Sequence, residues 1–364
     1  MHLLDQVAQT NQAMVVERSG GRDIWRLPGT DVLAHDLEQC ALRYVLHDDV
    51  TELCTELAFD DETIVGSSVE LIRIPAPTLW IEFSGRAQNK VLSNLGRLEG
   101  DFELSPHQRI GLLVKSDASG RKGEFRVCWE NESGLGPDIA PFIVEYDFND
   151  VSFSKSCHAT ADGTMIAADV VGHDALVPLF EHIRFRLNAD WHRYYRQSTG
   201  SESLYREALH TALNPMHKDI PFLSMFCLLL TSQSAFQVSA SDRSRLNRSR
   251  ARRGRSPLLD HVELTMNLAA HEPEFEDSAC SSADRSSPRL HFVRGHLVRR
   301  RNAIHWRTSH MRGKPAIGSI HSRTVSLRVT AGSSFQAPTA SGIAVRADRV
   351  LSTAFLSSQP SSVR

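Results

Sequence analysis

The sequence lacks the features that identify many enzymes and membrane proteins. Its longest apolar run, Phe222 to Leu230, contains Ser224 and is far shorter than the roughly 20 residues that a membrane-spanning helix needs, so no membrane span is expected. The phosphate-loop patterns GxxxxGK[ST] and GxGxxG are absent, as are HExxH and GxSxG. We therefore predict no catalytic residue and no cofactor.

Cysteine is present but not grouped. The six cysteines are scattered along the chain, with no CxxC and no short Cys–His spacing. This arrangement argues against a zinc finger and against a disulfide framework. The first residues, MHLLDQVAQTNQAMVV, have neither a basic stretch nor a sustained apolar run of the kind found in signal peptides. We expect a cytoplasmic protein whose cysteines are core residues in a reducing compartment.

Charge is divided unevenly. Residues 1–200 carry 18 Lys+Arg against 31 Asp+Glu, and residues 201–364 carry 23 against 12, so the net charges of −13 and +11 sum to −2. A basic half is a sign of an anionic partner such as nucleic acid. The alternative is that the two halves attract each other, within one chain or across a homodimer. The pattern predicts an acidic part over 1–200, a basic part over 201–329 and a disordered tail over 330–364.

Hydrophobic periodicity predicts the elements of these parts. Helical spacing is seen at 1–17 and 31–56, at 201–215 with a Ser cap and an end at Pro215, and in the wholly apolar 221–233. Strand-like alternation is seen at 79–83, 109–131, 142–154, 261–268 and 319–329. Residues 173–196 are expected to begin a mainly helical part. The predicted class is α+β, with antiparallel strands packed against helices and a basic C-terminal β-hairpin.

An arginine block lies in the middle of the basic half. Seven arginines occur between Arg243 and Arg255 with no acid in that span. We expect residues 241–261 to be mobile, or to be ordered only against a partner, because serine, arginine and glycine cannot build a core. Four of the arginines are expected to add nonspecific charge to a nucleic-acid surface: Arg250, Arg252, Arg253 and Arg255.

The most conspicuous stretch is Ser287 to Gly313, in which arginine and histidine are frequent and no acid occurs. Leu290 and Phe292 alternate with polar residues before a turn predicted at Arg301 to Ala303, and Ile304 and Trp306 alternate after it. This period-two pattern predicts a β-hairpin. We expect its arginines to contact phosphates and Trp306 to stack on bases. The candidate residues are Arg289, His291, Arg294, His296, Arg299, Arg300, Trp306, Arg307, His310 and Arg312.

Three other interpretations are open. The first is that the hairpin is a charged sheet edge, which protects against aggregation, with Trp306 and Phe292 as core residues. The second is that its histidines, His291 and His305 above all, meet across the hairpin and bind a metal, as in a metal-dependent nuclease; the acids that this needs are absent nearby. The third is that the protein inhibits a partner protein without binding nucleic acid.

A resemblance adds a further expectation. The run Pro288-Arg289-Leu290-His291-Phe292-Val293-Arg294-Gly295-His296, followed by Trp306 and Arg312-Gly313, resembles the C-terminal signature of a family from phages, plasmids and proteobacteria that includes a type V-A anti-CRISPR protein. The strand at 79–83 and the apolar helix ahead of the arginine block are similar in kind. Membership would imply a mobile-element protein that binds nucleic acid or a protein partner, not necessarily one that inhibits CRISPR. The partner that we expect is RNA or another nucleic acid, or a ribonucleoprotein such as a CRISPR effector.

Overall fold

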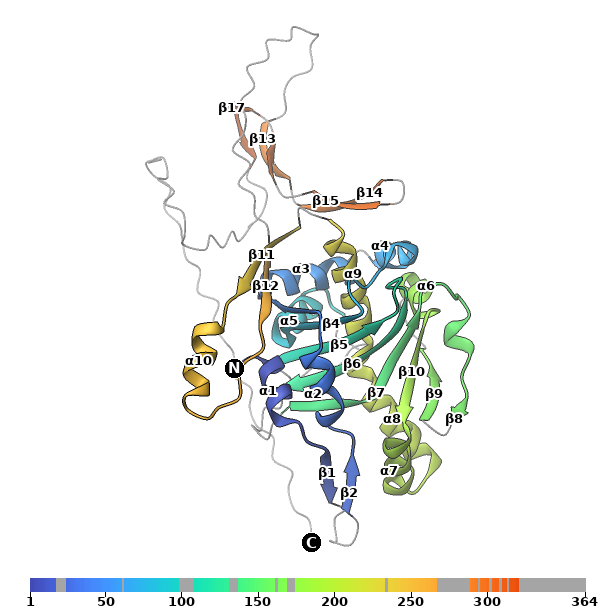
Figure 1. The fold of residues 1–364 in the computed structure, drawn as a ribbon. Coiled ribbons are helices and arrows are strands. Elements are labelled where there is room, and N and C mark those ends of the chain that lie inside the picture. Colours follow the sequence, from blue (N-terminus) through green and yellow to red (C-terminus); the bar gives the residue numbers. More distant parts are fainter. Residues whose placement is uncertain are drawn as a thin grey trace, which may run out of the picture. The chain divides into compact units, whose positions relative to one another are not determined.

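One ten-stranded mixed sheet organises the described chain (Figure 1). The computed structural model describes residues 1–17, 24–60, 62–97, 108–130, 137–160, 163–168, 174–232, 235–266, 289–293, 295–300, 303–307, 310–312 and 314–320. In spatial order the strands are β11 (Phe236–Ser241), β12 (His261–Met266), β3 (Leu42–Leu46), β4 (Thr78–Ser84), β5 (Arg109–Ser116), β6 (Lys122–Glu130), β7 (Pro137–Asp147), β10 (Ile183–Asn188), β9 (Gly163–Ala167) and β8 (Ala159–Thr160). Strand β3 pairs in parallel with β12 and β4, and the other neighbours are antiparallel.

Strands β4, β5, β6 and β7 divide their side chains between two covered faces. In β4, Leu79, Ile81 and Phe83 belong to the larger core, whereas Trp80 belongs to a smaller core on the opposite face. This alternation follows from the two-residue period of a strand. The larger core packs against helices α3 (Asp48–Phe59), α5 (Gly85–Asn94), α8 (Glu202–His217) and α9 (Asp219–Leu230), and the smaller core against α1 (Leu3–Thr10) and α2 (Asp31–Glu38).

Helix α9 fills the centre of the larger core. All of its residues except the last, Leu230, are buried, and the Phe222 ring stacks on that of Phe83 at 4.1 Å between ring centroids. This confirms the expectation of a wholly buried helix. Helix α8 begins at the predicted cap, where Ser201 Oγ accepts a hydrogen bond from the Leu204 N–H at 3.3 Å. The prediction that Pro215 ends this helix is wrong, because α8 continues to His217.

Three other predictions are corrected. The helical spacing predicted over 1–17 holds only for α1, because Met14 to Glu17 form a strand. The predicted helix over 31–56 is two helices, α2 and α3, separated by strand β3. The helical spacing of Leu37, Ala41 and Tyr44 runs across a strand whose partners lie far along the chain. The mainly helical part expected to begin at 173–196 does begin there, with the short α6 (Val177–Phe180) and α7 (Ala189–Thr199), but strand β10 lies between these two helices. The alternation of Ile183, Phe185 and Leu187 is the signal for this strand.

Smaller elements complete the described chain. A ribbon of β1 (Met14–Glu17) and β2 (Ile24–Leu27) projects from the body (Figure 1). Helices α4 (Glu62–Gly66) and α10 (Ser244–Ala251) follow α3 and β11. Near the C-terminus β14 (His296–Arg300) pairs with β15 (Ala303–Arg307), and β13 (Arg289–Val293) pairs with β16 (His310–Arg312) and β17 (Lys314–Ile320). The α+β class is thus confirmed, with the basic hairpin at β14–β15.

The predicted C-terminal hairpin differs from the observed one in its first strand. Leu290 and Phe292 were expected in that strand, but they belong to β13 in a separate three-stranded sheet. The pairing of Arg300 with Ala303 leaves only two residues in the connection, so Ala303 is in the strand rather than in the turn. Residues 271–287 and the predicted tail at 330–364 lie outside the described residues, as does most of the strand expected at 319–329.

Candidate nucleic-acid interface and a buried histidine cluster

The arginine block forms a short helix with an exposed basic surface. Arg245 and Arg248 lie on α10 and Arg252 is its C-cap, at the i, i+3, i+7 spacing that shares one helix face. These three residues, and Arg253 and Arg255 after them, are exposed. We call these five residues the arginine surface. Across the part of the chain that the structure describes, none of them lies within 4.0 Å of a carboxylate.

Helix α10 is held by the protein's own contacts. Asn247 Nδ2 donates to the Leu258 carbonyl at 2.9 Å, and the Leu258 N–H donates back to Asn247 Oδ1 at 2.8 Å. Arg250 Nε donates to the Ser256 carbonyl at 2.8 Å. Gly254, with φ of +65°, ends the helix in the left-handed conformation that glycine adopts easily. The expectation that 241–261 is mobile, or ordered only against a partner, is therefore wrong.

Asp5 joins this segment to α1. Its buried carboxylate accepts hydrogen bonds from Arg243 Nη1 at 2.8 Å and from the Leu259 N–H at 2.9 Å. Arg243 is therefore a structural residue, although it begins the arginine block. Arg250, which was predicted to add free charge, is half-buried and directed toward its own loop.

Many arginines elsewhere are neutralised by carboxylates. Arg184 Nη2 lies 2.8 Å from Glu145, and Arg186 Nη2 lies 2.7 Å from Glu124. The same holds for Arg109, Arg193, Arg196 and Arg206. The arginine surface differs from these residues in having no carboxylate partner among the described residues.

The β14–β15 hairpin has one face on the core and one face exposed. Ile304 and Trp306 are buried in the larger core, and the backbone N–H of Trp306 donates to Ser232 Oγ at 3.0 Å. His296, His305 and Arg307 are exposed. Because Trp306 is only 8% exposed, the prediction that it stacks on bases is wrong. The predicted alternation of Ile304 and Trp306 with polar residues is present, but the apolar face packs on the core, as the hydrophobic effect favours.

The histidines of the C-terminal stretch are not brought together as expected. His305 pairs with Val298 in the hairpin, whereas His291 is in β13 and pairs with Arg312 and Ile320. The prediction that His291 and His305 share one hairpin face is therefore wrong. His310 pairs with Val293, and Arg289 with Lys314. The structure describes only the backbone of Arg289, His291, Arg299, Arg300, His310 and Arg312, and Arg294 lies outside the described residues.

The two basic groups lie at opposite ends of an edge strand. Strand β11 begins four residues after Ser232, which the hairpin contacts, and ends two residues before Arg243. Figure 1 shows α10 at one end of the β11–β12 ribbon and the hairpin at the other. Six strand residues span about 20 Å. Val238 on this strand is 66% exposed, so the surface between the two groups is open.

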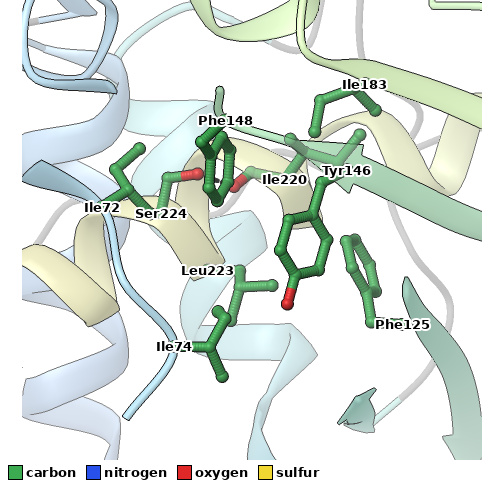
Figure 2. A pocket seen from close by; sticks show the side chains of 9 residues that line it. All are labelled: Ile72, Ile74, Phe125, Tyr146, Phe148, Ile183, Ile220, Leu223 and Ser224. Carbon is green, nitrogen blue, oxygen red and sulfur yellow. Dashed lines mark hydrogen bonds between the residues drawn. The ribbon is translucent and has the colours of Figure 1, made fainter. Parts of the chain in front are cut away.

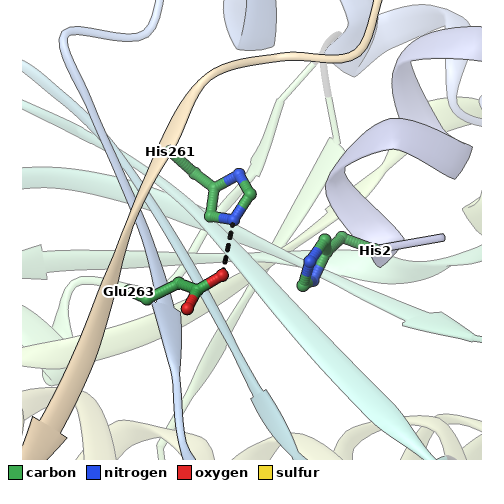
Figure 3. A group of neighbouring side chains, drawn as sticks. All are labelled: His2, His261 and Glu263. Carbon is green, nitrogen blue, oxygen red and sulfur yellow. Dashed lines mark ion pairs between the residues drawn. The ribbon is translucent and has the colours of Figure 1, made fainter. Parts of the chain in front are cut away.

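A second polar site, which sequence analysis missed, joins the N-terminus to β12. His2, His261 and Glu263 each offer a ligand atom, and these atoms all lie within 4.8 Å of one another (Figure 3). His261 Nε2 is 3.6 Å from Glu263 Oε1, and the rings of His2 and His261 are 4.7 Å apart between centroids. The spacing of His261 and Glu263 places both on one strand face. His2 is too distant in sequence for any spacing rule to include it.

Buried charges surround this cluster. Glu82, fully buried on β4, accepts hydrogen bonds from the Leu3 and Leu4 N–H groups at 3.0 and 2.9 Å and from Arg109 Nη1 at 2.6 Å. Burial by itself would raise the pKa of Glu82. Hydrogen bonds from His2 and the Leu4 N–H, together with the charge of Arg109, instead lower this pKa to about 2. Glu82 is thus ionised and caps the N-terminus of α1.

His261 is partnered at both ring nitrogens. Its Nδ1 lies 3.4 Å from the Leu259 carbonyl oxygen, and its Nε2 lies 3.4 Å from Arg243 Nη2. Burial, and next the charge of Arg243, lower the pKa of His261. The imidazole is therefore neutral at physiological pH, the form in which histidine binds metals.

Other enclosed sites are poor candidates for binding. The cavity in Figure 2 has a volume of ≈ 10 Å³ and apolar walls that include Ile72, Phe125 and Leu223; it has room for about one water and no ligand.

Lys218 and Asp219 are 0% exposed. Burial lowers the pKa of Lys218 to about 8 and raises that of Asp219 to about 7, but no substrate can reach them without an opening of the core.

A groove of ≈ 710 Å³ lies between β7, α7 and α8, with Trp129, Trp191 and Tyr195 among its walls. None of the predicted site residues lines it. Its lining is mainly apolar, and it contains no cluster of charged groups that would define a ligand.

Comparison with known proteins gives no assignment. No protein-family model, no curated protein and no solved structure matches the chain. Among the described helices, none has both the length and the apolar character needed to cross a bilayer.

Proposed function

We propose that this protein binds nucleic acid without cleaving it, and that the arginine surface makes the main contacts. The observation that carries the proposal is the set of five exposed arginines, Arg245 to Arg255, with no carboxylate within ion-pair distance in the described structure. Guanidinium groups bind phosphate bidentately and stack on bases. Since α10 is already ordered, binding does not have to bear the entropic cost of folding this helix.

The hairpin supplies a second contact in this proposal. His296, His305 and Arg307 are exposed on β14 and β15. The backbone carries Arg299 and Arg300 at the end of β14, and Arg289 and Arg312 on β13 and β16. Single-stranded nucleic acid lying along β11 would reach both groups, because β11 spans only about 20 Å.

RNA, free or within a ribonucleoprotein, is the partner that we favour. This preference rests on the resemblance of the C-terminal signature to the phage and plasmid family, which also makes a mobile-element origin and an anti-CRISPR-like role part of the proposal. A cytoplasmic location is included as well. Five cysteines of the described chain, of which Cys40, Cys54, Cys128 and Cys227 are buried, are free thiols, as a reducing compartment would keep them.

Salt dependence of binding to a fluorescent single-stranded RNA tests the proposal. The affinity is expected to fall steeply with salt, because each neutralised phosphate adds about 0.7 to the magnitude of the log–log slope. In the variant Arg245→Ala/Arg248→Ala/Arg252→Ala the magnitude of the slope should decrease by about 2. A salt-independent affinity, or a triple variant that binds like the wild type, would contradict it.

The matched control removes three arginines that are paired with carboxylates. Arg193, Arg196 and Arg206 are exposed on α7 and α8, but each has an acidic partner. Their triple alanine variant loses the same formal charge and should keep the wild-type slope. Equal losses in the two variants would show that total charge, rather than the arginine surface, determines binding.

The same preparation separates the two alternatives. If the purified protein binds neither RNA nor DNA at moderate salt but captures a protein, it is an interaction inhibitor. The nuclease alternative required hairpin histidines near each other, and the observed strand pairing separates His291 from His305. We expect the RNA to remain intact when divalent cations are added, and cleavage lost in His296→Ala would reverse this conclusion.

A further inference from the structure

We propose that His2, His261 and Glu263 bind one divalent transition-metal ion with the ligand preferences of zinc. Imidazole and carboxylate are ordinary zinc ligands. Tetrahedral coordination at about 2.0–2.1 Å requires ligand atoms about 3.3 Å apart. His261 Nε2 and Glu263 Oε1, at 3.6 Å, are already near this separation, and the whole set lies within 4.8 Å. Figure 3 shows the three side chains converging from β12 and the start of α1.

The surroundings orient both histidines as they would be in a metal site. His2 Nδ1 lies 3.4 Å from Glu82 Oε1 and 3.2 Å from Arg109 Nη1, and His261 Nδ1 lies 3.4 Å from the Leu259 carbonyl oxygen. Metal-binding histidines commonly donate their second ring N–H to a carboxylate or a backbone carbonyl. In each ring this arrangement leaves Nε2 as the nitrogen that can bind a metal.

The local charge also permits a cation. The cluster and its hydrogen-bonded neighbours contain three negative carboxylates, Asp5, Glu82 and Glu263. They contain two positive guanidinium groups, those of Arg109 and Arg243, so negative charge is in excess. Arg243 Nη2 lies 3.4 Å from His261 Nε2 and would have to move aside. Its Nη1 bond to Asp5 can remain while it does so.

The site would have an open coordination position. Three protein ligands converge among the described residues, and the side chains of His2 and Glu263 are 23% and 39% exposed. Sites of this composition hold a water or another small ligand in the fourth position. The metal would also join the N-terminal residue pair Met1–His2 to the sheet. The inference is independent of the arginine surface, since none of those five arginines takes part.

Calorimetric titration of the full chain, prepared without a histidine tag and stripped with a chelator, tests the proposal with Zn²⁺ alone. One equivalent should bind, and Co²⁺ should give the absorption of a tetrahedral or five-coordinate site. Glu263→Gln and His261→Gln should each weaken binding by at least about 10- to 100-fold, since even the loss of an outer-shell partner costs that much. His210→Gln, at an exposed histidine on α8, should change nothing.

The Glu263→Gln variant is expected to keep the fold, because this side chain is partly exposed. The metal-free variant should therefore unfold at the wild-type temperature. If the wild type takes up no stoichiometric Zn²⁺, the cluster is a hydrogen-bonded one completed by Arg243, and the proposal is wrong. Equal Zn²⁺ affinity in the wild type and in a correctly folded Glu263→Gln would also overturn it.

Discussion

Glu82 shows at the residue scale how a charge can be stable inside the protein. A carboxylate that is fully buried would ordinarily be protonated, since burial disfavours the charged form. Here two backbone N–H groups at the start of α1, Arg109 and His2 all stabilise the ionised form. One residue on β4 thus neutralises a guanidinium, caps a helix and orients a histidine.

Glu82 is predicted to make the free energy of unfolding depend on acid. Because the folded pKa is about 2, against an ordinary value of 4.5, the stabilisation is present above about pH 4.5 and is lost as the pH falls toward 2. The amount is on the order of 3 kcal/mol. Urea denaturation between pH 7 and 2 should show that Glu82→Gln is less stable at neutral pH, and that its deficit shrinks in acid.

The control for this experiment is Glu52→Gln. Glu52 pairs with Lys90 at 2.7 Å on the surface, and exposed ion pairs contribute about 0–1 kcal/mol. Its unfolding curve should follow the wild type at every pH. A constant difference between Glu82→Gln and wild type across the whole range would contradict the assigned pKa.

At the scale of the element, the β14–β15 hairpin explains part of the C-terminal signature as packing. A side-chain carbon at Gly295 would lie 2.5 Å from Trp306 Cζ2 and 3.1 Å from the Arg307 carbonyl oxygen. Glycine is therefore needed for the indole to lie over this backbone. Gly295 and Trp306, two of the residues that carry the family resemblance, serve to hold the hairpin on the core.

Trp306→Ala is predicted to lower the free energy of unfolding rather than to remove a direct contact with RNA. Removal of a buried tryptophan costs about 3–5 kcal/mol, so urea denaturation should show a loss of that order. Gly295→Ala should cost about 1–3 kcal/mol through overpacking. The exposed His305→Ala should remain within about 0.5 kcal/mol. A stable Trp306→Ala that loses only RNA affinity would restore the stacking role.

Helix α10 shows which part of an element the sequence could have predicted. Gly254 follows Arg252 and Arg253 as a recognisable helix stop, and Asp242 Oδ1 accepts a hydrogen bond from the Ser244 N–H at 2.9 Å at the start. The composition nevertheless favoured a mobile segment. What orders the helix is Asn247 with Leu258, and Asp5 with Arg243, and no local pattern predicts such pairs.

At the scale of the whole molecule, the boundary between acidic and basic halves is not a boundary in the fold. Strand β12 of the basic half pairs with β3 of the acidic half, and α9 fills the core beneath strands β4 and β5. Asp5 and Arg243 connect the halves by an ion pair at 2.8 Å. The sequence alternative that the two halves attract each other holds for this pair, within one chain.

Residues 1–200 expressed alone are therefore predicted not to fold cooperatively. They lack α8 and α9, so the apolar sides of β4, β5 and β7 would be exposed to water. Thermal unfolding followed by circular dichroism should show no sharp transition, and co-expression with residues 201–364 should restore one. A sharp transition in the 1–200 fragment by itself would show that the acidic half is an independent domain.

The sequence by itself determined the class of the fold, the strands β4, β5 and β6, the buried helix α9 and the separation of charge, because these depend on local periodicity and composition. Only the tertiary structure decided that β3 is a strand, that Trp306 is a core residue and that His2 meets His261 and Glu263. Each of these depends on partners distant in the chain, which are selected by burial and hydrogen bonding in the folded state. The local sequence pattern does not predict these distant partners.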